Sequence, residues 1–133
     1  MTEVKQRPVS VIIVDDSLVI RRRLAAMIAE LVGVEVVAEA STAQEGLELT
    51  ESLKPDVAVV DIRMPGRSGI GMLEDMKALD PRPKIIVLTN YPYVAYRRRC
   101  LDLGADYFFD KSTQFERVLE VLREMSSEQW EQG

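Results

Sequence analysis

Runs of apolar residues, rich in β-branched side chains, recur along the chain. Each run is short and bounded by turn-forming or charged residues, which is typical of strands buried on both faces. Such strands belong to parallel sheets covered by helices, because a sheet with one face in water alternates polar and apolar residues. These runs span Val9–Val14, Val57–Val60 and Lys84–Thr89, and two further strands are expected at Val34–Ala40 and at the aromatic stretch Asp106–Asp110.

The first two segments between these runs carry apolar residues at the three- and four-residue spacing of an amphipathic helix. Ser17 is placed to cap the first helix, which we expect to end at Gly33. Thr42 and Glu45 form a capping-box pattern at the start of the second helix, and Pro55 stops it. The side chains expected to face inward are Ile20, Leu24, Met27, Ile28 and Leu31 in the first helix and Ala43, Leu47 and Leu53 in the second.

Three more helices complete the pattern. A tight loop at Met64–Gly69 leads into a short third helix, which is broken at Asp80–Pro83. We expect the fourth helix at Pro92–Leu103, closed by Gly104, and a second capping box at Thr113–Glu116 to open the fifth. The inward-facing residues are Ile70, Leu73 and Met76 in the third helix and Phe115, Val118, Leu119 and Leu122 in the fifth.

This alternation predicts one α/β domain: a five-stranded parallel sheet with helices on both faces, joined by right-handed crossovers. The length of 133 residues has room for one such domain. We place it at residues 9–125, after an N-terminal extension at residues 1–8. Residues 126–133 form a polar tail that we expect to fray, with Trp130 able to fold back onto the surface.

Charge and missing residue types narrow the function. Asp and Glu outnumber Lys and Arg by 22 to 17, and the net charge of −5 disfavours nucleic acid and anionic lipid. The sequence contains no histidine, which excludes Ser-His and Cys-His nucleophile pairs, His-ligated zinc and phosphohistidine donation. With no apolar stretch long enough for a membrane helix and no signal-peptide core, we expect a cytoplasmic protein without a membrane partner.

Four of the expected strands deliver polar side chains to their carboxyl ends. Asp15 and Asp16 follow the first strand and Asp61 follows the third. Thr89 ends the fourth strand and Lys111 follows the fifth. In an open parallel sheet these ends share one edge, where ligands and reactive groups gather. The sequence therefore predicts one pocket that holds three acids, a hydroxyl and an ammonium.

Three carboxylates within a few ångström cannot all stay ionised unless a cation compensates their charge. Oxygen ligands without histidine or cysteine favour Mg²⁺, which commonly bridges carboxylates to phosphates. Lys111 could then neutralise one phosphoryl oxygen, and Thr89 could donate a hydrogen bond to another. Asp61 is left as the nucleophile of in-line phosphoryl transfer, and the product would be an aspartyl phosphate.

In this order, these residues resemble the receiver domains of two-component response regulators. The similarity covers about residues 9–125, and a set of five motifs in order at the expected strand ends is a specific signal. It implies a flavodoxin-like (βα)5 fold with the strand order 2-1-3-4-5. The motifs are Asp15-Asp16, Asp61 with Met64-Pro65-Gly66 and Gly69, Thr89, Gly104-Ala105-Asp106, and Lys111.

The resemblance also implies roles for single residues. Asp61 would accept a phosphoryl group from a sensor histidine kinase or a phosphotransfer protein. Asp16 and Asp61 would bind Mg²⁺ directly and Asp15 would bind it through water. The backbone carbonyl of Arg63 would complete the protein ligands.

Family members switch when they are phosphorylated. Lys111 and Thr89 would hold the phosphoryl oxygens, and the hydroxyl of Thr89 would move toward the phosphate. An aromatic residue on the last strand turns inward, and Phe108 occupies that position; without a hydroxyl it responds through burial. The change remodels the face of the fourth helix, fifth strand and fifth helix, where a downstream protein would bind. The resemblance leaves a phosphorylation-dependent homodimer open.

Two positions depart from the family's pattern. A proline often follows the lysine, frequently with a cis bond, whereas Ser112 follows Lys111 here. A cis Lys111–Ser112 bond would cost about 3–4 kcal/mol, so we expect either a trans bond or a strained site. The residue after Thr89 is usually small, and the larger Asn90 predicts a changed lifetime of the aspartyl phosphate.

Three features lie outside this site. The run Arg97–Arg99 fits a solvated helix face slightly better than a contact with an acidic partner. Tyr91, Tyr93 and Tyr96 lie beside the presumed output face, either as partner anchors or as cover for the helix. Cys100 is at an inward-facing small position and fits the core.

We expect a stand-alone receiver that acts by binding another protein, because only 22 residues follow Lys111 and leave no room for a DNA-binding output domain. A phosphate sink or relay intermediate is an alternative with the same chemistry. An aspartate-nucleophile phosphatase would carry a second acid two positions after Asp15, where this chain has Ser17. A constitutive interaction module with a vestigial site fits poorly with the complete set of acids, hydroxyl and ammonium.

Overall fold

The computed structural model describes residues 7–63, 69–90 and 94–132. In these residues five strands and five helices alternate, and all strands run parallel in the order β2-β1-β3-β4-β5. This confirms the predicted fold class and strand order. The elements are β1 (Val9–Val14), α1 (Leu18–Ile28), β2 (Val34–Ala40), α2 (Ala43–Leu53), β3 (Val57–Val60), α3 (Gly69–Lys77), β4 (Lys84–Thr89), α4 (Val94–Asp102), β5 (Tyr107–Asp110) and α5 (Arg117–Gln132).

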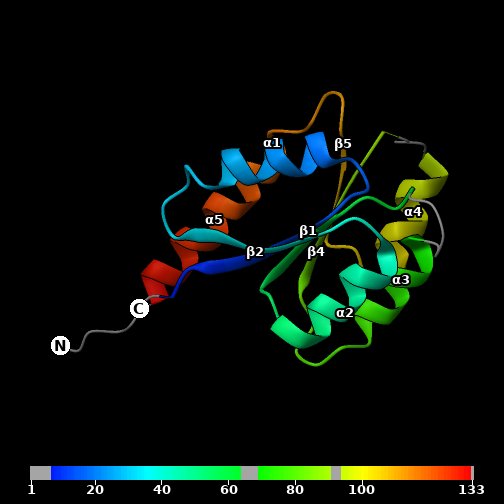
Figure 1. Ribbon diagram of the computed structural model, residues 1–133, viewed down its shortest axis with the longest axis horizontal. Coiled ribbons are helices and arrows are strands. Elements are labelled where there is room, and N and C mark those ends of the chain that lie inside the picture. The colour runs from blue at the N-terminus through cyan, green and yellow to red at the C-terminus, as the bar shows by residue number, and fades with distance from the viewer. Residues whose placement is uncertain (1–6, 64–68, 91–93, 133) are drawn as a thin grey trace.

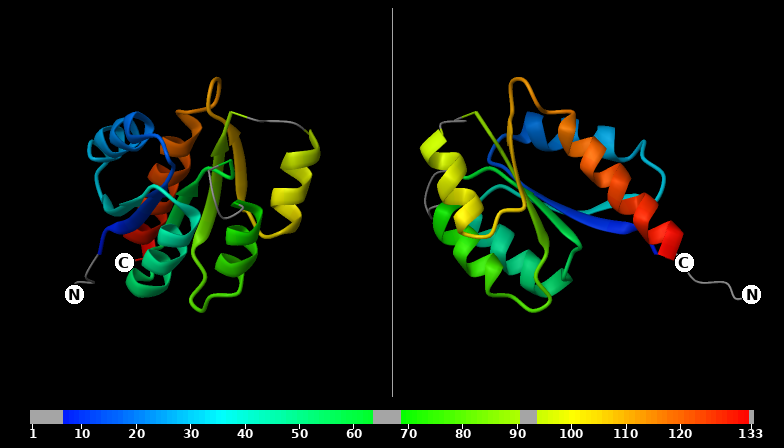
Figure 2. Two further views of the ribbon diagram at one scale, coloured as in Figure 1. Left: turned by 45° about the vertical axis from the view of Figure 1, so that its right-hand side comes forward. Right: turned by 180° about the vertical axis from the view of Figure 1, so that it is seen from behind.

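The sheet lies between two layers of helices. Helices α1 and α5 cover one face (Figure 1), and Figure 2 shows α2, α3 and α4 together on the other. Alternate strand residues supply the two layers, because successive side chains of a strand point to opposite faces. In β1, Val11 and Ile13 pack on the side of α1 and α5, whereas Ile12 and Val14 pack on the side of α2 and α3. Strands β1, β3 and β4 are buried on both faces, which explains their apolar runs, whereas the edge strand β2 exposes Glu35 and Val37.

The caps predicted for the first two helices are present. Ser17 Oγ accepts a hydrogen bond from the Ile20 N–H at 3.2 Å. Thr42 Oγ1 accepts from the Glu45 N–H at 3.1 Å, and Glu45 Oε1 accepts from the Ser41 N–H at 3.0 Å. The Ile20 and Glu45 N–H groups are backbone donors that a first helical turn leaves unpaired, and the Glu45 side chain reaches back to the residue before the Thr42 cap. The Ser17 cap also fixes the chain directly after the acid pair.

Two helix ends differ from the prediction. Helix α1 ends at Ile28, and the N–H groups of residues 30 and 31 then donate to carbonyls three residues back. Gly33, with φ of +81°, makes the reversal into β2 instead of closing the helix. Helix α5 begins at Arg117, so the Thr113–Glu116 box is wrong. The turn before it is closed by Gln114, whose N–H donates to the Asp110 carbonyl at 2.7 Å.

The inward face of α2 also differs, because Leu53 is 46% exposed. The buried stripe runs through Ala43, Gly46 and Thr50, at helical spacing, and Leu53 lies at its border in the last turn. Gly46 allows a close approach to the sheet, since a Cβ there would lie 2.8 Å from Val14 Cγ1. The helix is thus packed through its small residues.

Helix α5 continues through Gln132, so the described part of the C-terminal tail is helical, and its fraying stays a prediction. Ser126 is buried, and its Oγ donates to the Val32 carbonyl at 2.9 Å. This bond ties α5 to the turn between α1 and β2.

Some expectations concern residues outside the described ranges. They are the loop at 64–68, the helix start at Pro92, the anchors Tyr91 and Tyr93, and the side chain of Trp130. Across the described residues, none of the helices has both the length and the apolar character needed to cross a membrane.

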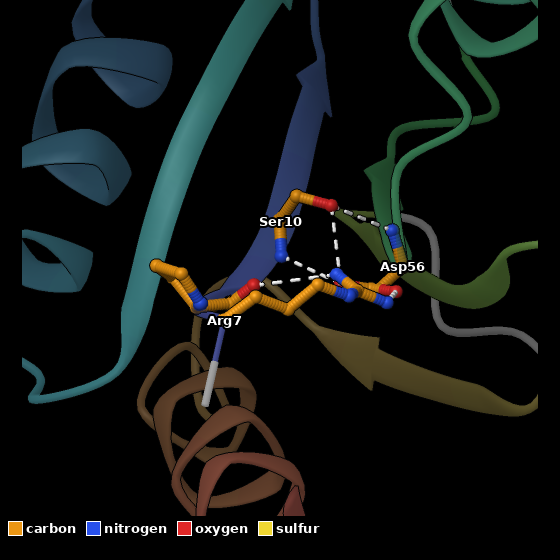
Figure 3. A network of polar contacts seen from close by, with 4 residues as sticks. Arg7, Ser10 and Asp56 are labelled. Carbon is orange, nitrogen blue, oxygen red and sulfur yellow. Dashed lines mark hydrogen bonds and ion pairs between the residues drawn. The ribbon is translucent and has the colours of Figure 1, made fainter. Parts of the chain in front are cut away.

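The edge of the sheet at the amino ends of the strands is closed by Asp56, the residue before β3. Arg7 Nη1 and Nη2 donate to Asp56 Oδ2 and Oδ1, each at 2.8 Å (Figure 3). The Ser10 N–H and Oγ donate to Asp56 Oδ2 at 2.9 and 3.1 Å. This network lies at the opposite end of β3 from Asp61, and it supports the fold rather than the candidate site.

Candidate functional site

Three of the predicted site residues are held by extensions of the sheet. The N–H of Asp15 donates to the Ala40 carbonyl at 3.0 Å, and the N–H of Asp61 donates to the Val14 carbonyl at 2.9 Å. The N–H of Lys111 donates to the Thr89 carbonyl at 2.8 Å. Each residue stands one position beyond its strand, but its backbone is still part of the ladder. The carboxyl edge is therefore a rigid platform for these side chains.

Lys111 lies between the two buried acids. Its Nζ is 2.7 Å from Asp15 Oδ2 and 2.9 Å from Asp61 Oδ2. The side chains of Lys111, Asp15 and Asp61 are 6%, 4% and 8% exposed. Because a buried charge without a partner costs about 3–5 kcal/mol, the three groups depend on one another.

In both buried acids, the second carboxylate oxygen accepts a backbone hydrogen bond. Asp15 Oδ1 accepts from the Ser17 N–H at 2.9 Å, and Asp61 Oδ1 accepts from the Arg63 N–H at 3.0 Å. In both cases the donor is two residues ahead, as in an Asx turn. The two carboxylates are therefore oriented by local turns as well as by Lys111.

Asp16 joins these acids to form a cluster of oxygen donors. One carboxylate oxygen from each of Asp15, Asp16 and Asp61 lies within 4.8 Å of the others. Asp16 is exposed, whereas the other two are buried. When ionised, three carboxylates beside one ammonium leave two negative charges. A divalent ion that prefers oxygen ligands, such as Mg²⁺, fits this donor set.

Burial and the contacts of Lys111 with the two acids shift the pKa values of the buried groups. Burial raises the pKa of Asp15, and the opposing bonds from Lys111 and the Ser17 N–H do not cancel its effect. Burial alone would lower the pKa of Lys111, but the hydrogen bonds and charges of Asp15 and Asp61 outweigh it and raise that pKa. Lys111 therefore keeps its proton at neutral pH. A bound divalent cation would favour the ionised form of Asp15.

The remaining predicted residues lie close to this edge or in the core below it. Thr89 is fully buried at the end of β4, and its carbonyl accepts from Lys111. Phe108 is 7% exposed and packs in the layer that contains Cys100. Within the described ranges the cis peptide bond is Asp80–Pro81, so the Lys111–Ser112 bond is trans. Asn90 is exposed, and its effect on phosphoryl lifetime stays a prediction.

Two arginine contacts were not predicted from the sequence. Arg21 Nη1 donates to the Asp15 carbonyl at 2.7 Å, although Arg21 belongs to a run of three arginines that resembles a solvated helix face. Arg63 was predicted only through its backbone, but its side chain reaches Tyr96 on α4. The helical phase set by the Ser17 cap is the one sequence signal that could have singled out Arg21.

Helix α4 carries the other features noted in the sequence. Arg97, Arg98 and Arg99 are exposed, and Val94 is 76% exposed. Cys100 is buried in the core as predicted, and burial raises its pKa to about 11. A groove of about 610 Å³ runs along α4 and includes none of the acid cluster; it is lined by Val94, Ala95, Arg98, Arg99, Asp102 and Leu103.

A family match and individual relatives indicate the same protein family. Residues 11–123 match the family described as the response regulator receiver domain. Chemotaxis protein CheY of Thermotoga maritima is 36% identical over 116 residues, which cover 87% of this chain and 96% of CheY. Response regulator GacA of Pseudomonas aeruginosa is 28% identical over 117 residues, 88% of this chain and 55% of GacA. The chain thus spans about half the length of GacA.

The fold is also similar to that of a solved receiver domain. A crystal structure of a CheY-like response regulator receiver domain protein from Methanospirillum hungatei matches with a TM-score of 0.78 and 32% identity. The match covers 95% of this chain and 99% of the other. Sequence and fold therefore agree over nearly the whole chain.

Proposed function

The chain belongs to the response regulator receiver domains, and from this premise we propose that Asp61 accepts a phosphoryl group from the phosphohistidine of a sensor kinase or phosphotransfer protein. Receiver domains are phosphoacceptor switches, largely without enzyme activity of their own. The observation that supports the assignment most strongly is the contact of Lys111 with both Asp15 and Asp61, beside Asp16. It gathers a nucleophile, a countercharge and a cation site at one sheet edge.

In the transfer, one carboxylate oxygen of Asp61 attacks phosphorus in line with the P–N bond of the phosphohistidine. The O–P bond forms while the P–N bond breaks. The electron pair of the P–N bond leaves with the donor imidazole, which takes up a proton from solvent. Hydrolysis of the resulting acyl phosphate returns the Asp61 carboxylate and releases inorganic phosphate.

We assign Mg²⁺ to the acid cluster, with Asp16 and Asp61 as direct ligands and Asp15 acting through water. The backbone carbonyl of Arg63 is the fourth protein group, and the Arg63 N–H is already bonded to Asp61 Oδ1. When bound, Mg²⁺ supplies positive charge to the phosphoryl oxygens. Asp16 is the exposed member of the cluster and is open to a hydrated ion from solvent.

Lys111 and Thr89 bind the oxygens of the transferred group. The Lys111 ammonium is fixed by β5 and by Asp15, so it can remain at the site when Asp61 is phosphorylated. Thr89 can donate its hydroxyl proton to a second phosphoryl oxygen. Both groups would then stabilise the negative charge on the oxygens of the transferred phosphoryl group.

The switch runs from Thr89 through Phe108 to the face of α4, β5 and α5. Thr89 and Phe108 lie on the paired strands β4 and β5, where Val87 is the partner of Phe108. A downstream protein would bind this face, and the α4 groove with its exposed Val94 offers an apolar anchor point. The same face could serve a phosphorylation-dependent homodimer.

The test is calorimetric titration with Mg²⁺ and with a beryllofluoride mimic of the phosphoryl group. We expect beryllofluoride to bind only when Mg²⁺ is present, and Asp61→Asn to abolish its binding. Asp102→Asn, at an exposed position on α4, controls for loss of one negative charge. Absence of Mg²⁺-dependent binding in the wild type would instead support a constitutive interaction module.

A further inference from the structure

Arg21 differs from the neighbouring arginines on α1 because it turns toward the acid cluster. Its Nη1 donates to the Asp15 carbonyl at 2.7 Å, and its Nε donates to Glu39 Oε1 at 3.1 Å. The Arg21 side chain is 14% exposed, whereas Arg22 is an exposed residue. One guanidinium therefore joins the first turns of α1 to the ends of both β1 and β2.

The carbonyl held by Arg21 belongs to the peptide group between Asp15 and Asp16. On the other side of Asp15, its N–H is bonded to Ala40 of β2. The direction in which Asp16 leaves the chain depends on the orientation of this peptide group. A charge-assisted hydrogen bond is short and directional, so the Arg21 bond constrains that orientation.

We propose that Arg21 is a positioning residue for the metal site. By holding the Asp15 carbonyl and bracing it against Glu39, it keeps the carboxylates of Asp15 and Asp16 directed at a common cation. This inference rests on the proposed function, because it requires these acids to serve Mg²⁺. Arg21 itself touches neither the ion nor the phosphoryl group and acts through the backbone.

A simple charge effect of Arg21 would change the Mg²⁺ affinity in the opposite direction from a positioning effect. A guanidinium near a divalent cation repels it, so removal of the Arg21 charge alone would strengthen Mg²⁺ binding. Loss of positioning weakens binding, because the acidic ligands must then be ordered when the ion arrives. The direction of the change in Mg²⁺ affinity therefore separates the two explanations.

The experiment is calorimetric titration of the full chain with Mg²⁺ for the wild type, Arg21→Gln, Arg21→Lys and Arg22→Gln. We expect Arg21→Gln to weaken Mg²⁺ binding about tenfold, at the low end for groups that orient metal ligands. The Mg²⁺ affinity of Arg21→Lys should lie between those of the wild type and Arg21→Gln, because an ammonium keeps the charge but lacks the planar fork of a guanidinium. Arg22→Gln removes the same charge from the same helix and should bind like the wild type.

Urea unfolding of each variant completes the design. A merely structural role would lower the unfolding midpoint without changing the affinity of folded protein. If the wild type binds Mg²⁺ and Arg21→Gln binds it as tightly or more tightly, this inference is overturned. The proposed function is then unaffected. If Arg21→Gln does not fold, wild-type affinity in Arg21→Lys would overturn it. A wild type that binds no Mg²⁺ would overturn the proposed function and this inference together.

Discussion

The side chain of Arg63 binds Tyr96 of α4, with Nη1 donating to the Tyr96 hydroxyl at 3.2 Å. The Arg63 Cζ also lies 5.9 Å from the centroid of the Tyr96 ring, within the range of a cation–π contact. The N–H of the same arginine donates to Asp61 Oδ1. One residue thus links the proposed acceptor carboxylate to the first helix of the proposed output face.

Tyr96→Phe removes the hydroxyl acceptor and keeps the ring. We expect α4 to lose about 0.5–1 kcal/mol of local stability, the contribution of an exposed hydrogen bond. Amide hydrogen exchange in α4 should accelerate about two- to fivefold, because opening becomes easier by that amount. Tyr107→Phe on β5 is the control, and equal α4 exchange in the wild type and Tyr96→Phe would contradict the link.

Replacing two glycines of α3 by alanine should change the free energy of unfolding in opposite directions. A Cβ at Gly69 would clash with the backbone of Ile62, the residue after Asp61, whereas a Cβ at Gly71 has no atom within 4 Å. Gly69→Ala should lower the free energy of unfolding by about 1–3 kcal/mol or more through overpacking. Gly71→Ala should raise it by about 0.5–1 kcal/mol, because alanine favours the helix. Urea denaturation of both variants tests the contrast, which fails if they change stability in the same direction.

The Asp56 network predicts a dependence of stability on pH. Burial alone would raise the pKa of Asp56, but the bonds from Arg7 and Ser10 outweigh it and lower the pKa. A lowered folded-state pKa stabilises the protein above the ordinary Asp pKa of about 3.9. This stabilisation is lost as the pH falls through the folded-state value.

Asp56→Asn should therefore destabilise the fold by about 1–3 kcal/mol near neutral pH. The gap to the wild type should narrow below about pH 4, as the wild-type carboxylate takes up its proton. Urea midpoints across this pH range provide the measurement, with the exposed Asp102→Asn as the control. A gap that stays constant with pH would show that the ionised carboxylate of Asp56 is not what stabilises this edge.

Asn90 directly follows Thr89 and is exposed at the carboxyl edge. The resemblance to receivers implies a smaller residue at this position, so we expect the Asn90 side chain to restrict access to an acyl phosphate on Asp61. Asn90→Ala should change the rate of dephosphorylation, measured as the decay of phosphorylated protein after donor removal. Identical decay in the two proteins would refute this role.

The strands and the composition of the site could be predicted because local pattern determines them. The run Val57–Val60 has to be buried on both faces, and Asp61 directly follows it. A parallel sheet puts the carboxyl ends of all strands at one edge, and the strand order implied by the family resemblance then brings the ends of β1, β3 and β5 together. Salt bridges from Lys111 to Asp15 and Asp61 are the physical result.

Features that depend on helical phase or on turns could not be predicted in this way. Arg21 and Arg22 are adjacent in one run of arginines, and only their helical phase, fixed by the Ser17 cap, turns Arg21 toward Glu39. Leu53 continues the apolar spacing of α2, yet it is the last residue of the helix and remains largely exposed. Thr113 has the spacing of a cap, but Gln114 closes the turn first.

The site of phosphorylation can be tested directly by finding the residue to which a phosphoryl group attaches. The full chain is incubated with acetyl phosphate and Mg²⁺, and the modified residue is located by peptide mass spectrometry after borohydride reduction of the acyl phosphate. We predict one phosphoryl group on Asp61, which requires Mg²⁺ and is lost in Asp61→Asn. Modification at another residue, or undiminished modification of Asp61→Asn, would contradict the assignment of Asp61 as the phosphoacceptor.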